Sequence, residues 1–489
     1  MRAFGQEGKV SGRLLIFHYS IMVLPSLKYE LRGTYLYRAL TLLSFLAFYF
    51  LATSCQTAKP TATSTPTPSS TAPPPKLTYK QIQTQLEQSP VFAQNFTGLA
   101  LYDLDSSKMV VAYNADKYFT PASNTKILTF YAGLKILRDS IPAFRYTIQH
   151  DSLLFWGTAD PTLLHPDLPN PRVWQFLKNR PEKLYFSAAN FATVPLGPGW
   201  SWDDYNDYYS TERSPLPVYG NTVRFTGKLG TTKAQVTPRY FKNQVKTELF
   251  SSAANNIVVR EYDQNKFTFY PKRVKKDFET DVPFKQSPEL TLKLLSDTLQ
   301  RPVKLIKQRL LRPTRTFYAN PVDSLYKRMM VESDNTFAEH LLLLCAAIIF
   351  DSLNTTLIIN HVKKTYLSDL PDPPNWVDGS GLSRLNLITP RDIVALWQKI
   401  YQEVPRNRLF SLLSAGGKDG TLKDYYRSDV PFVFGKTGSL SNNYSQSGFI
   451  TTKSGKTYIF AFMNNNFTRP TAEIRQEMER LVTAIHLNF

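Results

Sequence analysis

Ser123 and Lys126 are the two residues of this 489-residue chain whose types and spacing most directly suggest covalent chemistry. A lysine three residues after a serine lies on the same side of a helix, where its amine can reach the serine hydroxyl. A neutral amine in that position removes the hydroxyl proton and makes the serine a nucleophile. Because an ordinary lysine has a pKa near 10.4, it is neutral only about once in 2,500 at pH 7, and the pair needs burial or a nearby cation to lower that pKa. Taken alone, the pair is better explained as a polar first turn on a core helix, since two common residues often occur at this spacing.

Ser333 and Asn335 belong to a second motif, Ser-Asp-Asn, which stands directly before an apolar stretch that predicts a helix at 337–350. The serine hydroxyl can relay a proton to a leaving nitrogen, and the asparagine amide can hold Lys126 or a substrate amide in place. An ordinary cap of the following helix explains the same three residues about as well.

A third motif, Lys436-Thr437-Gly438, lies where a predicted strand closes in a turn. Lys436 offers a cation and Thr437 a hydroxyl to a substrate carboxylate, and the same cation is the neighbour that the first motif needs. Gly438 allows a substrate backbone to approach closely, and the N–H of Ser439 can complete an oxyanion hole with that of Ser123. Lys-Thr-Gly alone is also typical of a turn, but the three motifs in this order indicate a site for acyl transfer.

The elements that must position these motifs are helices and short strands. The Ser123 helix is predicted to have Thr120 as its N-cap and Pro121 as its first residue, and apolar residues recur at helical spacing to Leu137. Residues 140–315 change to short strand-like runs with many aromatic residues. The remaining predicted elements are hairpins of 96–103 with 109–113 and of 448–452 with 457–463, and helices at 288–299, 322–331 and 471–485. This order predicts an α/β fold in which helices flank an antiparallel sheet, with an inserted β-rich region.

Composition limits the classes of partner. The formal net charge is +19, of which residues 1–55 contribute +4 through six Lys/Arg and two Glu. The basic remainder favours an anionic neighbour, such as a membrane surface or an acidic polymer, or is simply a basic solvated surface. The chain lacks a nucleic-acid recognition motif, its six histidines lack metal-ligand spacing, and its two cysteines make no disulfide framework. We therefore expect no metal, no cofactor and no nucleic acid.

The N-terminal part predicts export. Residues 39–54 carry no charge, follow three basic residues and end at Cys55, which is typical of a signal segment at 1–55. Small residues directly before Cys55 resemble a lipoprotein cleavage site, so lipidation of Cys55 is the prediction, with simple cleavage or a retained anchor as alternatives. Residues 56–76 are a Pro/Thr/Ser linker that cannot bury a core. We expect an exported periplasmic or cell-envelope protein tethered to the membrane, with Met22 as an alternative start.

With these motifs the chain resembles the penicillin-recognising serine acyltransferases. Ser333 follows Ser123 by 210 residues, which is too long a separation for a class A β-lactamase. The chain looks like the D-alanyl-D-alanine carboxypeptidase/endopeptidase family, the class C low-molecular-mass penicillin-binding proteins. Further stretches that match this family are Gly157–Thr162, Pro198–Asp204, Asp378–Arg384 and Gly417–Leu422.

The resemblance implies a transpeptidase-like domain at 77–137 and 316–489, with two small β-rich domains inserted at 138–315. It implies cleavage of terminal D-alanine, or of D,D-cross-links, in peptidoglycan stem peptides through an acyl-enzyme on Ser123, with β-lactam antibiotics as covalent inhibitors. It also implies that an aspartate of the insert binds the diamino-acid side chain of the stem, for which Asp160 is the candidate.

Two rival functions use the same scaffold. A β-lactamase-like hydrolase shares the acyl chemistry but must activate a deacylating water, and the sequence offers no obvious extra carboxylate for that step. A non-catalytic cell-wall-binding protein would be expected to lose Ser123, Lys126 or Lys436, and all three are present.

Overall fold

The computed structural model describes residues 77–250 and 255–489. The predicted signal segment, Cys55 and the linker lie outside the described residues. The described residues form one compact unit. The finer division into a catalytic domain and an insert with boundaries at 137 and 316 stays a prediction.

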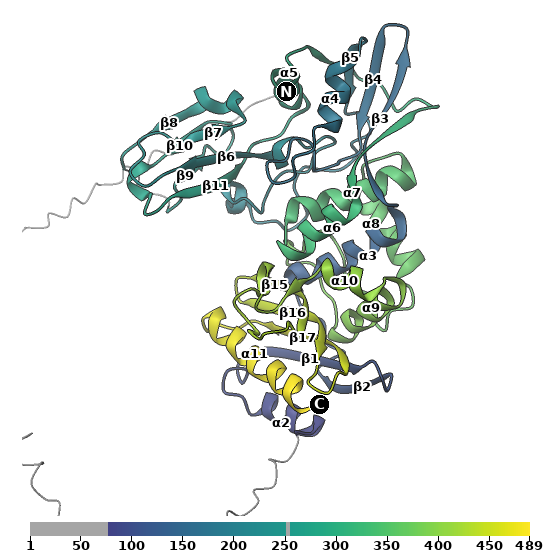
Figure 1. The fold of residues 1–489 in the computed structure, drawn as a ribbon, viewed down its shortest axis with the longest axis vertical. Helices are drawn as coiled ribbons and strands as arrows, with labels where there is room; N and C mark the ends of the chain where they lie inside the picture. Colours follow the sequence, from purple (N-terminus) through teal and green to yellow (C-terminus); the bar gives the residue numbers. More distant parts are fainter. Residues whose placement is uncertain (1–76, 251–254) are drawn as a thin grey trace, which may run out of the picture. The chain divides into compact units, whose positions relative to one another are not determined.

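A six-stranded antiparallel sheet joins the two ends of this unit (Figure 1). The strand β1 (Phe96–Asp103) lies between β2 (Lys108–Tyr113) and β17 (Thr457–Asn465), and pairs with β17 from Phe96–Asn465 to Asp103–Tyr458. The sheet continues through β16 (Asn443–Thr451), β15 (Val433–Leu440) and the short β14 (Ser414–Ala415). Strands near residue 100 and near residue 460 therefore form one scaffold, and the predicted α/β fold with an antiparallel sheet is confirmed.

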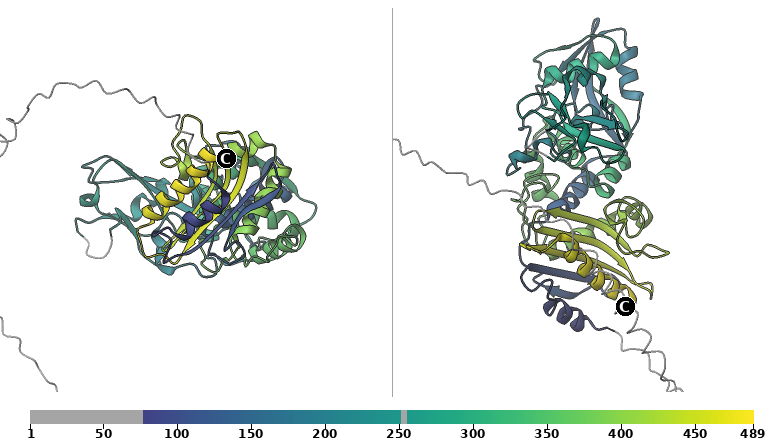
Figure 2. Two further views of the ribbon diagram at one scale, coloured as in Figure 1. Left: turned by 90° about the horizontal axis from the view of Figure 1, so that it is seen from below. Right: turned by 90° about the vertical axis from the view of Figure 1, so that its left-hand side faces the viewer.

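Alternate residues of the sheet pack against different helices, as the two-residue period of a strand requires. Leu99 and Leu101 of β1 join one core with α2 (Tyr79–Glu87) and α11 (Thr471–Asn488), which lies along this face of the sheet in Figure 2. Ala100 joins the other core, which contains the remaining helices of this part of the chain. Those helices are α3 (Lys126–Ile136), α6 (Val322–Val331), α7 (Asn335–Phe350), α8 (Thr355–Tyr366), α9 (Pro390–Glu403) and α10 (Arg406–Ser411).

Residues between α3 and α6 form a β-rich region with its own core of buried aliphatic and phenylalanine side chains. A five-stranded sheet in the order β12-β5-β4-β3-β13 lies beside two three-stranded sheets, β11-β6-β7 and β8-β10-β9. The helix expected at 288–299 is present as α5 (Pro288–Leu299), whereas α4 (Arg172–Asn179), which buries Val173 and Leu177, was not predicted. The strands are β3 (Ser140–Gln149), β4 (Ser152–Gly157), β5 (Lys183–Ser187), β6 (Thr222–Gly227), β7 (Gln235–Thr237), β8 (Val245–Thr247), β9 (Val258–Arg260), β10 (Phe267–Phe269), β11 (Phe278–Pro283), β12 (Val303–Leu305) and β13 (Arg315–Pro321).

Within residues 77–250 and 255–489, no helix combines the length and the apolar character needed to cross a bilayer.

Candidate active site

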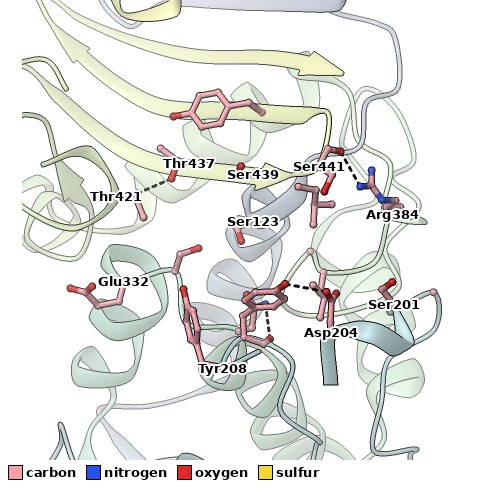
Figure 3. Close-up of a pocket in the computed structure, with 18 of the residues that line it drawn as sticks. Ser123, Ser201, Asp204, Tyr208, Glu332, Arg384, Thr421, Thr437, Ser439 and Ser441 are labelled. Carbon is pink, nitrogen blue, oxygen red and sulfur yellow. Dashed lines mark hydrogen bonds between the residues drawn. The ribbon is translucent and has the colours of Figure 1, made fainter. Parts of the chain in front are cut away.

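A cavity of about 750 Å³ brings the three sequence motifs to one place (Figure 3). Ser123 comes from the start of the α3 segment, Ser333 and Asn335 from the junction of α6 with α7, and Thr437 and Ser439 from β15. The loop between α8 and α9 and a segment of the β-rich region also line it, together with Thr421, Tyr444 and Arg475. Segments more than 300 residues apart in sequence therefore surround one hydroxyl.

Ser123 stands on a single 3₁₀ turn, η1 (Ala122–Thr125), and α3 begins only at Lys126. The prediction that Thr120 caps this helix is wrong. The backbone N–H of Thr120 donates to Asn465 Oδ1 at 3.0 Å, and its carbonyl accepts from Asn465 Nδ2 at 3.1 Å. These two bonds tie Thr120 to the end of β17, so the nucleophile's turn is attached directly to the sheet.

Two glycines allow other segments to approach this turn. A Cβ on Gly438 would lie 2.8 Å from the backbone nitrogen of Ser123 and 2.4 Å from the carbonyl oxygen of Pro121. A Cβ on Gly381, whose φ is +80°, would lie 1.9 Å from the carbonyl oxygen of Ala122. Gly438 therefore lets β15 pack against the nucleophile's turn. From the sequence alone, this glycine was instead expected to allow the close approach of a substrate backbone.

Lys126 is fully buried, and its Nζ has three close partners. Ser123 Oγ lies at 2.8 Å, Asn335 Oδ1 at 2.6 Å and the carbonyl oxygen of Ser380 at 2.7 Å. A neutral amine has two N–H donors and one lone pair, and the amide oxygen and the carbonyl can only accept. These two acceptors take both N–H groups, which leaves the lone pair for the hydroxyl proton of Ser123.

Burial lowers the pKa of Lys126 to about 8, against the opposing charges of Asp378, Glu339 and Asp334. A lysine with that pKa is neutral in about a tenth of molecules at pH 7, compared with about one in 2,500 for an ordinary lysine. The site thus supplies the lowered pKa that a lysine base needs, and it does so mainly by removing the amine from water.

The side chain of Asn335 is held by the β-rich region. Its Nδ2 donates to the carbonyl oxygen of Tyr209 at 2.9 Å, while its Oδ1 accepts from Lys126. Because the amide nitrogen already faces a carbonyl, the oxygen must face the lysine. Asn335 therefore holds Lys126 by means of a contact that local sequence does not reveal.

Ser333 occupies the left-handed backbone region, with φ at 60°. A non-glycine residue there carries strain of about 1–3 kcal/mol, which is typical of functional sites. The helix-cap explanation of this motif applies to Asp334, whose carboxylate accepts from the N–H of Phe337 at 3.1 Å. The Ser333 hydroxyl is left to face the cavity, where it accepts from Lys436 Nζ at 2.8 Å.

Lys436 lies behind the wall of the cavity. Its side chain is fully buried, and Nζ donates to Ser333 Oγ and, at 2.7 Å, to the carbonyl oxygen of Thr437. Burial and the charge of Lys126 lower its pKa well below the usual value. Thr437 lines the cavity, with its hydroxyl bonded at 2.7 Å to that of Thr421. The predicted direct contact of Lys436 with a substrate carboxylate stays a prediction, and the geometry favours action through Ser333.

A buried ion pair stands behind the catalytic lysine, and the motifs did not point to it. Glu339 Oε2 accepts from Arg213 at 2.6 and 2.9 Å, and its Oε1 accepts from the N–H of Ser380 at 2.8 Å. The carbonyl of Ser380 is in turn an acceptor for Lys126. A glutamate within the apolar stretch of α7 could have indicated a buried charge from the sequence. Its partner, Arg213, lies 126 residues away in the β-rich region.

The loop that carries Ser380 is organised by Asp378. Its carboxylate accepts from the N–H groups of Gly381 at 2.9 Å and Ser383 at 2.7 Å, and from Trp200 Nε1 at 2.9 Å. Burial and the charge of Glu339 raise the pKa of Asp378 to about 6. The stretch Asp378–Arg384 therefore positions the carbonyl of Ser380, which accepts a hydrogen bond from Lys126.

Asp160 is not brought to the cavity. Its side chain is fully buried, Oδ1 accepts from the N–H of Thr162 at 2.9 Å, and burial raises its pKa to about 6. The insert contributes Asp203 and Asp204 to the cavity lining instead, from the 3₁₀ turn η2 (Trp202–Asn206). The role of Asp160 in substrate binding stays a prediction without geometric support.

The sheet, the helical layer and the Ser-x-x-Lys, Ser-x-Asn and Lys-Thr-Gly motifs around one cavity define a penicillin-recognising serine enzyme. The family model of D-Ala-D-Ala carboxypeptidase 3 (S13) matches residues 78–485, and the chain belongs to this family. The predicted family and enzyme class, a serine-type D-Ala-D-Ala carboxypeptidase, are confirmed.

Individual relatives agree with this family assignment. The D-alanyl-D-alanine carboxypeptidase DacB of Haemophilus influenzae is 21% identical over 431 residues, which are 79% of this chain and 88% of that protein. The crystal structure of penicillin-binding protein 4 (dacB) from Haemophilus influenzae has a TM-score of 0.67 at 20% identity, covering 83% of this chain and 99% of the other. The same protein complexed with a β-lactam has a TM-score of 0.62 at 19% identity, with the same coverage. At these identities the two structures support the fold.

Proposed function

We propose that this enzyme removes the terminal D-alanine of peptidoglycan stem peptides through an acyl-enzyme on Ser123. The observation that carries this proposal is the set of three partners around Lys126 Nζ, because it directs the lone pair of a neutral amine at Ser123 Oγ. A non-catalytic wall-binding protein has no need of a buried lysine held in this way.

In acylation, Lys126 takes the proton of Ser123, and Oγ forms a bond to the carbonyl carbon of the penultimate D-alanine. The backbone N–H groups of Ser123 and Ser439, both cavity residues, are the donors assigned to the oxyanion. The C–N bond then breaks as the proton held by Lys126 passes by way of the Ser333 hydroxyl to the leaving nitrogen, so that free D-alanine departs and Lys126 is neutral again. In deacylation, a water attacks the ester while Lys126 takes its proton, and Ser123 recovers its hydroxyl.

The terminal carboxylate of the substrate is assigned to the hydroxyls of Thr437 and Thr421, which are bonded to each other at 2.7 Å. The diamino-acid side chain of the stem is assigned to the far side of the cavity. Asp203 and Asp204 stand there with Arg384, whose guanidinium donates to the carbonyl oxygen of Ser441 at 2.9 Å. A side chain that ends in both an amine and a carboxylate matches this pair of opposite charges.

Purified muropeptides test the proposal. The wild-type chain is expected to release D-alanine from pentapeptide monomers, and Ser123→Ala to release none. Conversion of cross-linked dimers to monomers would add D,D-endopeptidase activity at the same serine. If Ser123→Ala retained D-alanine release, the assignment of the nucleophile would be wrong. If Asp203→Asn left discrimination between diamino-acid and neutral stems unchanged, the assignment of that subsite would be wrong.

The Arg213–Glu339 pair gives a prediction about pH. Arg213→Gln removes the cation that balances Glu339, so the carboxylate should raise the pKa of Lys126 by about one unit. We expect the midpoint of acylation rate against pH to move upward by that amount. The double variant Arg213→Gln/Glu339→Gln removes both charges and should return the midpoint toward that of the wild type. A fall in rate at every pH with an unchanged midpoint would mean that the pair only supports the fold.

Peptidoglycan lies in the cell envelope, so the enzyme acts there. We further propose that the mature chain begins at a lipidated Cys55 and is held to the membrane through residues 56–76. Mass spectrometry of the protein from the membrane fraction would detect the lipid on Cys55. An N-terminus elsewhere, or an unmodified Cys55, would refute the tether without affecting the enzyme.

A further inference from the structure

Three aromatic side chains gather on the surface next to the active-site cavity. Trp202 is 71% exposed and Tyr262 is 50% exposed, with ring centroids 6.1 Å apart. Tyr205 contacts Tyr262 at 5.0 Å, and both pairs are close to perpendicular. These three residues, here called the aromatic platform, come from η2 and from the turn between β9 and β10. Aromatic rings that are exposed and grouped in this way are typical of a surface that binds a ligand or a partner.

The platform adjoins the segment that lines the substrate cavity. Ser201 and Asp203, the residues on either side of Trp202 in the chain, both line the cavity. Figure 3 shows the side chains of Ser201 and Asp204, from the same segment, beside that cavity. A ligand that extends out of the cavity along this segment therefore comes close to the platform.

Buried hydrogen bonds hold the platform in place. Arg260, only 4% exposed, stacks on the Tyr205 ring at 5.2 Å and donates to the carbonyl oxygens of Tyr205, Glu261 and Tyr262 at 2.9 to 3.2 Å. Asn206 joins the same two segments through the N–H of Arg260, at 2.7 Å, and the carbonyl of Val258, at 3.1 Å. Rings fixed before binding lose little conformational freedom when a ligand arrives.

The charges around the platform select the kind of ligand. Asp203 and Asp204 lie on its own turn, and the carboxylate of Asp263, 77% exposed, lies on the turn that carries Tyr262, with Lys285 Nζ at 3.8 Å. Carboxylates repel the phosphates of nucleic acid and of anionic lipids, both of which also contact aromatic residues. A neutral ligand with an apolar face and many hydroxyls matches rings bordered by hydrogen-bond acceptors. Sugar rings have that character, because their axial C–H groups carry slight positive charge and meet the negative face of an aromatic ring.

We propose that the aromatic platform binds sugar rings of the peptidoglycan glycan strand while the stem peptide of that strand occupies the cavity. This inference rests on the proposed function, since the stem peptide and the glycan belong to one substrate. The platform would then favour stems that are still attached to polymer over free peptides, without touching the reacting atoms.

The test compares two substrates that carry the same pentapeptide, one as free peptide and one on polymeric glycan. Trp202→Ala is expected to lower kcat/KM for D-alanine release from the polymer about five- to tenfold and to leave the free peptide within about twofold of wild type. Trp202→Phe, which keeps a flat ring, should recover part of the loss. Tyr318→Ala, at a tyrosine 49% exposed elsewhere on the β-rich region, is the matched control and should change neither substrate. Labelling of every variant with a fluorescent penicillin verifies that the cavity is intact.

Each other outcome contradicts a specific claim. An equal loss on both substrates would assign Trp202 to the stem-peptide site, and no loss on either would show that the platform binds no sugar. Isothermal titration of Ser123→Ala with a peptide-free oligomer of N-acetylglucosamine gives a second readout, in which Trp202→Ala should abolish binding. Failure of the wild type to release D-alanine from either substrate would instead overturn the proposed function.

Discussion

Replacing Lys126 with alanine is expected to abolish acylation of Ser123 even at saturating substrate. The lysine is the group placed to take the Ser123 proton, at 2.8 Å, and a base acts on the chemical step and not on ground-state binding. The expected loss in acylation rate is about 10²–10⁴-fold. Single-turnover reaction with a penicillin measures it directly.

Lys135, on the same helix and exposed, provides the matched control. Lys135→Ala should acylate at the wild-type rate, which separates loss of the base from a general change in charge. If Lys126→Ala still acylated within tenfold of wild type, another group would be the base.

The wild-type rate should also depend on pH in a direction set by the same lysine. Because the neutral form is the base and its pKa is about 8, acylation should rise about tenfold between pH 7 and pH 9. Below pH 7 each further unit should lower the rate about tenfold, since protonation removes the lone pair.

Lys436→Met is expected to slow acylation of every substrate, whether or not it has a free carboxylate. Lys436 is fully buried and donates to Ser333 Oγ, so its removal leaves the hydroxyl of the proton relay without the amine that holds it in place. A buried hydrogen-bonding group left without its partner costs about 1–3 kcal/mol, which corresponds to roughly five- to hundredfold in rate. Acylation by a carboxylate substrate and by its amide analogue should fall by similar factors.

Thr437→Val is the matched variant for the cavity wall. It removes a hydroxyl that faces the cavity, and should impair the carboxylate substrate more than the amide. If Lys436→Met were selective for the carboxylate substrate, Lys436 would contact that carboxylate directly, and its assignment to Ser333 would be wrong.

The parts of the site that sequence revealed are those whose residues are close together in the chain. Ser123 and Lys126 lie three apart, and Lys436 to Ser439 are consecutive, so a helix start or a strand end brings each set together by local geometry. The α/β class followed in the same way from helical and strand periodicity.

What sequence did not reveal depends on contacts between distant segments. Thr120 was expected to cap a helix, but Asn465, 345 residues later, takes up its backbone groups. The orientation of Asn335 depends on the carbonyl of Tyr209, 126 residues earlier, and no local pattern encodes a backbone acceptor at that distance. Asp160 was proposed from its place in a matched stretch, and only the fold shows that its carboxylate is buried away from the cavity.

The central claim is that Ser123 forms the acyl-enzyme, and labelling with a fluorescent penicillin followed by mass spectrometry of the digested protein tests it most directly. The wild-type chain should carry one covalent adduct, on the peptide that contains Ser123, and Ser123→Ala should carry none. An adduct at another residue, or labelling that persists in Ser123→Ala, would contradict the account.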